Sequence, residues 1–239
     1  MNGTKWHERG RRVALTMLAV ALIVLVVFFC PAQLLRSGFE PSEEPAWEGP
    51  FGGGAYGGSG GGRLVEGSLG DFVRTGGRSV RLEVWDDGSD QSVAWAGITQ
   101  TLPCELRRKV QAGVWLYFSS TNLPLRPCAS AHVRVEYFKD AEGQELIPEC
   151  VYVSPPLSPD THASDTWHLM EVTGRIPAES RSLRVSVVVM GQEMRGQTQA
   201  VWIDDLFVEM QPTPSPGRNR RPGRAAMPVT PQYVQCSGR

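Results

Sequence analysis

The sequence predicts an all-β fold in which two antiparallel sheets pack as a β-sandwich, preceded by one transmembrane or signal-anchor helix. Between residues 34 and 210, apolar residues recur with a period of two in short runs separated by Gly, Pro, Asp and Asn. This pattern is typical of half-buried strands. Residues 13–30 instead form one uncharged apolar run, "VALTMLAVALIVLVVFFC". The chain therefore divides into an N-terminal apolar segment and one β domain.

The N-terminal segment has the charge pattern of a membrane anchor. Residues 1–12 contain Lys5, Arg9, Arg11 and Arg12, and no small-x-small cleavage site is evident after the apolar run. Its 18 residues come close to the ~20 that span a bilayer and exceed a secretion h-region. We expect residues 1–12 to be cytoplasmic, 13–33 to span the membrane, and the rest to lie outside. The alternative is a cleaved signal, which would leave a secreted domain.

The β domain is expected over residues 34–210. Its strands are "RSVRLEVW", "VAWAGITQTL", "AGVWLYFSS", "AHVRVEYFK", "QELIPECVYV", "TWHLMEVTG", "SLRVSVVVM" and "AVWIDDLFVEM", with a hairpin turn at "DAEG", residues 140–143. No helices alternate with these strands, which excludes a βαβ fold and favours two packed antiparallel sheets. Roughly eight to ten such strands indicate a jelly roll.

Two segments are expected to lie outside the sheets. The stretch "FGGGAYGGSGGGR", residues 51–63, is interpreted as a flexible glycine-rich loop able to line a ligand groove. Residues 211–239 contain five Arg, repeated Pro and no acidic residue, so a disordered tail is predicted there.

Composition narrows the classes of function. The formal net charge is −1, which argues against a nucleic-acid partner. Cys104, Cys128 and Cys150 fall in the domain, and their disulfide connectivity is left open. No Cys/His cluster at zinc spacing is present.

The order of several fragments resembles the CenC-type carbohydrate-binding modules, a galactose-binding-like jelly-roll family that is often fused to glycoside hydrolases. The fragments are "GFE" at 38–40, "GGRSVRLEV" at 76–84, "WAGITQTL" at 95–102, "AGVWLYFS" at 112–119, "VRVEYFKDAEG" at 133–143, "DTWHLMEVTGRIPAES" at 165–180, and "VWIDDLFVEM". The sequence departs from the family pattern at Arg36, where Asn is common, and in the long glycine-rich segment.

The resemblance implies a structural calcium ion (Ca2+) held by Glu40 and by Asp204 or Asp205. Alternation places Asp204 in phase with Leu206 and Val208, so we expect Asp204 to point inward and Asp205 to face solvent. Calcium binds six to eight oxygen ligands. The alternative is an Asp204 capped by backbone amides or paired with an Arg.

The resemblance further implies sugar binding on aromatic side chains, because pyranose rings pack on indole and phenol faces. The candidates are Trp85, Trp95, Trp115, Tyr117 and Tyr137. Trp85 stands out because it shares the polar face of its strand with Arg81 and Glu83. The partner would be a polysaccharide or other glycan.

These patterns predict a noncatalytic carbohydrate-binding module displayed on the outer side of a membrane. The alternative is a structural, adhesion or envelope-assembly module that keeps the fold without binding sugar. An enzyme is not expected. Adjacent strand residues such as Asp204 and Asp205 point apart, whereas a glycosidase pair converges across the sugar.

Overall fold

The computed structural model describes residues 32–40, 47–55, 58–66, 71–88, 92–104, 108–127 and 129–212. Residues 1–31 lie outside the described residues, and with them the cytoplasmic segment 1–12 and most of the anchor expected at 13–33. Cys128 and residues 213–239 also lie outside them. Within the described ranges, no helix has the length and hydropathy needed to cross a membrane.

The regular secondary structure of the described residues consists of strands. Their bounds are β1 Ala32–Ser37, β2 Glu48–Ala55, β3 Gly58–Glu66, β4 Arg78–Asp86, β5 Val93–Pro103, β6 Arg108–Phe118, β7 Ala129–Phe138, β8 Tyr152–Val153, β9 Thr166–Arg175, β10 Ser182–Gln192 and β11 Gln199–Pro212. β1 begins at Ala32, two residues inside the segment expected to span the membrane. β11 continues to Pro212, two residues into the expected tail.

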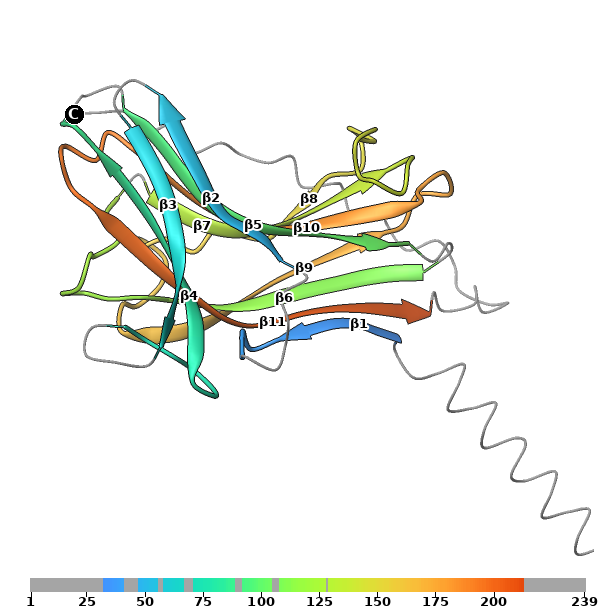
Figure 1. Cartoon of the computed structure of the whole chain (residues 1–239), viewed down its shortest axis with the longest axis horizontal. Helices are drawn as coiled ribbons and strands as arrows, with labels where there is room; N and C mark the ends of the chain where they lie inside the picture. The colour runs from blue at the N-terminus through green and yellow to red at the C-terminus, as the bar shows by residue number, and fades with distance from the viewer. Residues whose placement is uncertain are drawn as a thin grey trace, which may run out of the picture.

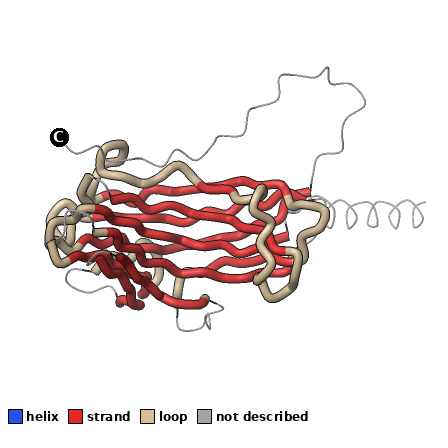
Figure 2. The backbone as a smooth tube through the Cα atoms, turned by 90° about the horizontal axis from the view of Figure 1, so that it is seen from above, coloured by secondary structure: helices blue, strands red, loops and turns tan. Residues whose placement is uncertain are grey.

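Two antiparallel sheets make the sandwich, which confirms the predicted fold class. Sheet A has the order β3-β4-β11-β6-β9, and β1 pairs with β11. Sheet B has the order β2-β5-β10-β7-β8. The chain crosses between the sheets at each step from β4 to β7 and from β9 to β11 (Figure 1), as in a jelly roll. The strands run lengthwise and the loops gather at the two ends (Figure 2).

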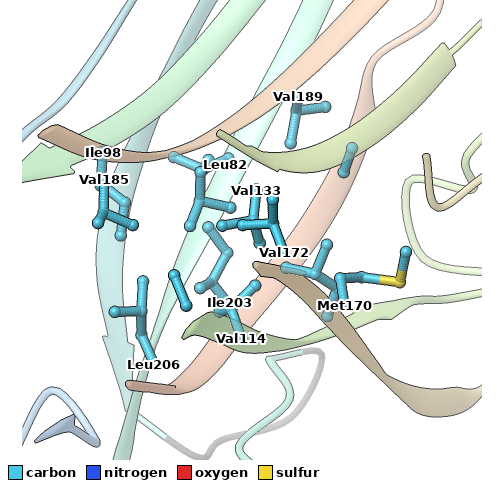
Figure 3. Close-up of a cluster of buried hydrophobic side chains, with 14 of the residues drawn as sticks. Leu82, Ile98, Val114, Val133, Met170, Val172, Val185, Val189, Ile203 and Leu206 are labelled. Carbon is cyan, nitrogen blue, oxygen red and sulfur yellow. The ribbon is translucent and has the colours of Figure 1, made fainter. Parts of the chain in front are cut away.

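The core lies between the sheets and follows the alternation read from the sequence. Leu82 on β4, Val114 on β6 and Ile203 on β11 face Ile98 on β5 and Val133 on β7, all at most 2% exposed (Figure 3). Truncating such a side chain to alanine typically costs about 2–5 kcal/mol. The core therefore fixes which face of each strand remains available for binding.

One predicted strand forms only in part. Residues 144–153 were expected to pair with β7 throughout, but the pairing is limited to a bridge between Leu146 and Phe138 and to the two-residue β8. Pro148 lies between these contacts and has no N–H to donate to a ladder. The turn at residues 140–143 does reverse the chain, as the hydrogen bond from Lys139 N to Glu145 O shows.

Most of the glycine-rich segment belongs to two strands, one in each sheet, so its interpretation as a flexible loop was wrong. β2 and β3 contain most of it and lie side by side (Figure 1). A Cβ at Gly60 would overlap the carbonyl of Trp95, and one at Gly52 would overlap the carbonyl of Gly60. Packed sheets are normally ~10 Å apart because side chains fill the space. Here glycine allows the backbones of the two sheets to touch.

β11 contains a bulge that overturns the predicted orientation of Asp204. Asp204 pairs with Trp115 and Phe207 with Gly113, so β11 has one residue more than β6 between these pairs. Asp205 has a positive φ of 47°, as bulge residues often do. Residues 201 and 203 face the core before the bulge, and residues 206, 208 and 210 face it afterwards. Asp204 therefore lies on the outer side of sheet A.

Candidate functional site

Three of the five predicted sugar-binding aromatics are covered. Tyr137 points between the sheets with 0% exposure, because it shares the inward phase of Val133 and Val135. Burial raises the pKa of its phenol well above the ordinary value, and Cys104 adds to this shift. Tyr137 is a core residue and cannot act as a sugar platform.

Tyr117 and Trp115 lie on the outer side of sheet A beneath other groups. The ring of Tyr117 is 4.3 Å from Phe72 and 5.4 Å from Trp167, centroid to centroid. Its hydroxyl donates to Asp165 Oδ1 at 3.2 Å. Burial, followed by the charge of Asp165, raises its pKa to about 12. Tyr117 is 7% exposed, and the Arg74 guanidinium lies 3.9 Å above one face of the half-buried Trp115 ring. Neither aromatic is therefore an open platform.

Trp85 and Trp95 are exposed, but on opposite sides of the sandwich. Trp85 is 37% exposed on the outer side of sheet A, beside Gly61 on β3. Trp95 is 39% exposed on the outer side of sheet B, because its neighbours Ala94 and Ala96 face the core. The two indoles therefore cannot contribute to one binding surface.

Trp95 is the better platform because a second aromatic stands beside it. Phe51 on β2 is also 39% exposed, and its ring centroid lies 6.1 Å from that of Trp95 at an interplanar angle of 68°. Gly53 pairs with Trp95 across β2 and β5. A Cβ at Gly53 would come 3.3 Å from the indole Nε1, so the absence of a side chain lets the ring lie over β2. The glycine-rich strand β2 thus supports the platform.

Polar side chains continue the same surface across sheet B. The register places Met190 beside Trp95, His132 beside Val188, and Arg134 beside Ser186. Arg134 forms an ion pair with Glu136 at 2.6 Å. We call this surface the Trp95 face, and it consists of Phe51, Gly53, Trp95, Thr99, Ser130, His132, Arg134, Ser186, Val188 and Met190.

The Trp95 face changes from apolar to polar along its strands. Trp95 and Thr99 are four residues apart, about 13 Å along an extended strand, which suits an oligosaccharide better than a single ring. The hydroxyls of Thr99 and Ser186 are hydrogen-bonded to each other at 2.9 Å and are 5% and 9% exposed. His132 and Arg134 are more accessible than this hydroxyl pair.

The three predicted calcium ligands meet at one corner of sheet A, but their oxygens bind N–H and O–H donors. Asp204 Oδ2 accepts from the amides of Arg74 at 2.8 Å and Thr75 at 3.1 Å. Asp204 Oδ1 accepts from the amide of Asp205 at 2.7 Å. Burial raises the pKa of Asp204, whereas these amides act to lower it. This is the alternative of a carboxylate capped by backbone amides.

The carboxylate oxygens of Asp205 and Glu40 also bind N–H and O–H donors. Asp205 Oδ1 accepts from the Thr75 hydroxyl at 2.6 Å, and Oδ2 forms an ion pair with the Arg74 guanidinium. Glu40 Oε1 accepts from the amides of Gly77 at 2.6 Å and Arg78 at 3.2 Å. Calcium requires converging oxygens, and this corner is lined by donors. In the part of the chain that the structure describes, no cluster of three His, Cys, Asp or Glu has metal-binding geometry. The residues as arranged do not fit the ion.

The solved structures that resemble the chain include carbohydrate-binding modules. One comes from a study of promiscuous carbohydrate-binding modules of the β-sandwich superfamily (12% identity, 72% of this chain, 60% of that chain, TM-score 0.48). Others are TmCBM61 with β-1,4-galactotriose (16%, 72% and 92%, 0.43) and a xylan-binding CBM22-1 domain of Paenibacillus barcinonensis Xyn10C (12%, 77% and 98%, 0.43). No protein-family model and no curated protein matches the chain. Function is therefore argued below from this chain's own residues.

His132 gives the Trp95 face a neutral imidazole. Its burial, and then the charge of Arg134, lower its pKa to about 4. At neutral pH the ring therefore has one N–H donor and one acceptor nitrogen. A sugar hydroxyl also donates and accepts, so an uncharged imidazole suits it well. The sequence alone suggested only an ordinary surface histidine here.

This lowered pKa predicts a pH-dependent stability. The unfolded chain, with a His pKa of 6.5, binds more protons than the folded chain with a pKa of about 4. Stability should therefore fall as the pH decreases from 6.5 to about 4, with His132 contributing up to about 3 kcal/mol. Urea unfolding of the wild type and His132→Gln across this range measures the contribution. We expect the wild type to lose stability more steeply, and parallel profiles would contradict the lowered pKa.

Proposed function

We propose that the Trp95 face binds a carbohydrate chain and that the domain is a noncatalytic binding module. The observation that carries the proposal is the pairing of Trp95 and Phe51, two exposed aromatics on one face of sheet B. Aromatic rings accept the C–H faces of sugars, and polar groups around them fix orientation. His132 and Arg134 supply such groups two strands away from the platform.

We further propose display on the outer side of a membrane through the apolar run at residues 13–30. One residue, Pro31, separates the apolar run ending at Cys30 from β1 at Ala32. A spanning segment there would hold the sandwich close to the bilayer surface. The basic residues before the run favour a cytoplasmic N-terminus.

The second candidate is a structural or adhesion module without sugar binding. It is favoured by the hydroxyls of Thr99 and Ser186, which bond to each other and are nearly buried. These two groups offer little to a ligand. Fewer accessible polar groups then remain to orient a sugar on the platform.

A glycan array probed with the full chain separates the two candidates. The array should include neutral polysaccharides such as β-1,4-galactan and xylan, together with acidic and branched glycans. Binding to at least one glycan, competed by the same glycan in solution, supports the binding module. No binding by a folded, monodisperse sample would overturn it and favour the structural module.

A further inference from the structure

One corner of sheet A has a feature that a structural calcium ion would not explain. The corner is formed by Glu40, Arg74, Thr75, Asp204 and Asp205. It contains a side-chain cation, because the Arg74 guanidinium pairs with Asp205 and lies over Trp115. We propose that Arg74 takes the place of a bound metal ion at this corner. The domain then closes without calcium, because the guanidinium and the backbone amides compensate the carboxylates.

The first support is the position of the guanidinium between two groups that stabilise positive charge. Asp205 lies on one side, and the Trp115 ring is 3.9 Å away on the other. A cation over an indole contributes about 0.5–2 kcal/mol, depending on how far it is desolvated. The Arg74 and Asp205 side chains are 30% and 28% exposed, so solvent only partly screens their attraction. A divalent ion beside Asp205 would have to displace this guanidinium.

The second support is the backbone of the segment that carries Arg74. Residues 74 and 75 turn their amides toward Asp204, and residues 77 and 78 turn theirs toward Glu40. Calcium sites use backbone carbonyl oxygens, so this polarity is opposite to that of a calcium loop. Gly76 makes the turn possible, because its φ is +67° and a Cβ there would overlap Glu40. The backbone N–H dipoles and the Arg74 guanidinium together compensate the negative charge of the carboxylates.

The third support is the role of the corner in the fold. The segment from Asp71 to Arg78 leads into β4, Glu40 follows β1, and Asp204 and Asp205 form the bulge of β11. The corner therefore ties three distant parts of the chain together. This is a task that structural calcium performs in other proteins, and here the chain's own donors can do it.

Thermal unfolding of the full chain in excess calcium and in chelator tests the proposal. For the wild type we expect the same melting temperature in both. Arg74→Gln should melt at a lower temperature by the same amount in calcium and in chelator, because backbone amides still occupy the oxygens of Asp204 and Glu40. Arg74→Gln/Asp205→Asn should lose less stability than the sum of the two single variants, because each of them removes the same ion pair.

Two results would overturn the proposal. One is a wild-type melting temperature that rises with calcium and no longer does so in Asp205→Asn, which would show a true calcium site. The other is a folded Arg74→Gln variant that melts at the wild-type temperature, which would show that the guanidinium does not stabilise the corner. If Arg74→Gln does not fold in chelator, Arg74→Lys provides the second readout. It keeps the charge, so it should fold and remain insensitive to calcium, and calcium sensitivity in this variant would also contradict the proposal.

Discussion

Replacing Trp95 with alanine is expected to weaken glycan binding by about 10- to 100-fold and to leave the melting temperature nearly unchanged. The loss follows from removing an aromatic platform whose burial by ligand is worth about 1.5–3 kcal/mol. The fold should tolerate the change because Trp95 is 39% exposed and points away from the core. Titration calorimetry with the best ligand from the glycan array measures the affinity.

Trp85→Ala is the matched control for this experiment. Trp85 is 37% exposed on the outer side of sheet A, so its loss removes an indole of similar exposure without touching sheet B. We expect wild-type affinity for this variant. Unchanged affinity in Trp95→Ala, or a loss in Trp85→Ala instead, would place the binding surface elsewhere. Trp95→Phe should retain part of the affinity, because it preserves a smaller platform.

Gly60→Ala is expected to destabilise the fold by about 3 kcal/mol or more. A methyl group at this position would overlap the carbonyl oxygen of Trp95. The backbones of β3 and β5 would have to separate, and overpacking of this kind typically costs about 1–3 kcal/mol and sometimes more. Urea unfolding followed by tryptophan fluorescence measures the change in the free energy of unfolding.

Gly61→Ala is the control, because Gly61 is the next residue on the same strand. It distinguishes a steric clash at Gly60 from the general effect of replacing a glycine in β3. Its Cβ would point outward and meet only the Trp85 ring at 3.6 Å, an ordinary van der Waals distance. Alanine also reduces the entropy of the unfolded chain. We expect this variant to match or slightly exceed the wild type in stability. Equal destabilisation of both variants would show that the close approach at Gly60 is not the cause.

The sequence predicted the sandwich well, because apolar and polar residues alternate with a fixed period of two along a strand that is buried on one face. The expected strands around Leu82, Ile98 and Val133 all exist, and these residues face the core. The prediction failed at Asp204, where one extra residue in β11 shifts the phase between residues 203 and 206. A bulge has no periodic signal, so extrapolating the alternation backward from Leu206 gave the wrong face.

The candidate site was predicted only in part for a related reason. Alternation could place Trp95 on an outer face and Tyr137 on an inner one, and Tyr137 should have been excluded on this ground. It could not show that Arg74 and Phe72 cover Trp115 and Tyr117, because that cover comes from a segment distant in sequence. Phe51 was missed because the glycines around it indicated a loop.

The glycine-rich strands β2 and β3 also determine how the sandwich meets other molecules. β2 and β3 are the edge strands of sheets B and A on the same side. Exposed edges have unpaired N–H and C=O groups on which a foreign strand can assemble. Backbone contact between β2 and β3 leaves no gap for such a strand, and the opposite edge of sheet B is the two-residue β8. Sheet B, which holds the Trp95 face, is therefore protected from edge-to-edge aggregation when many copies crowd together.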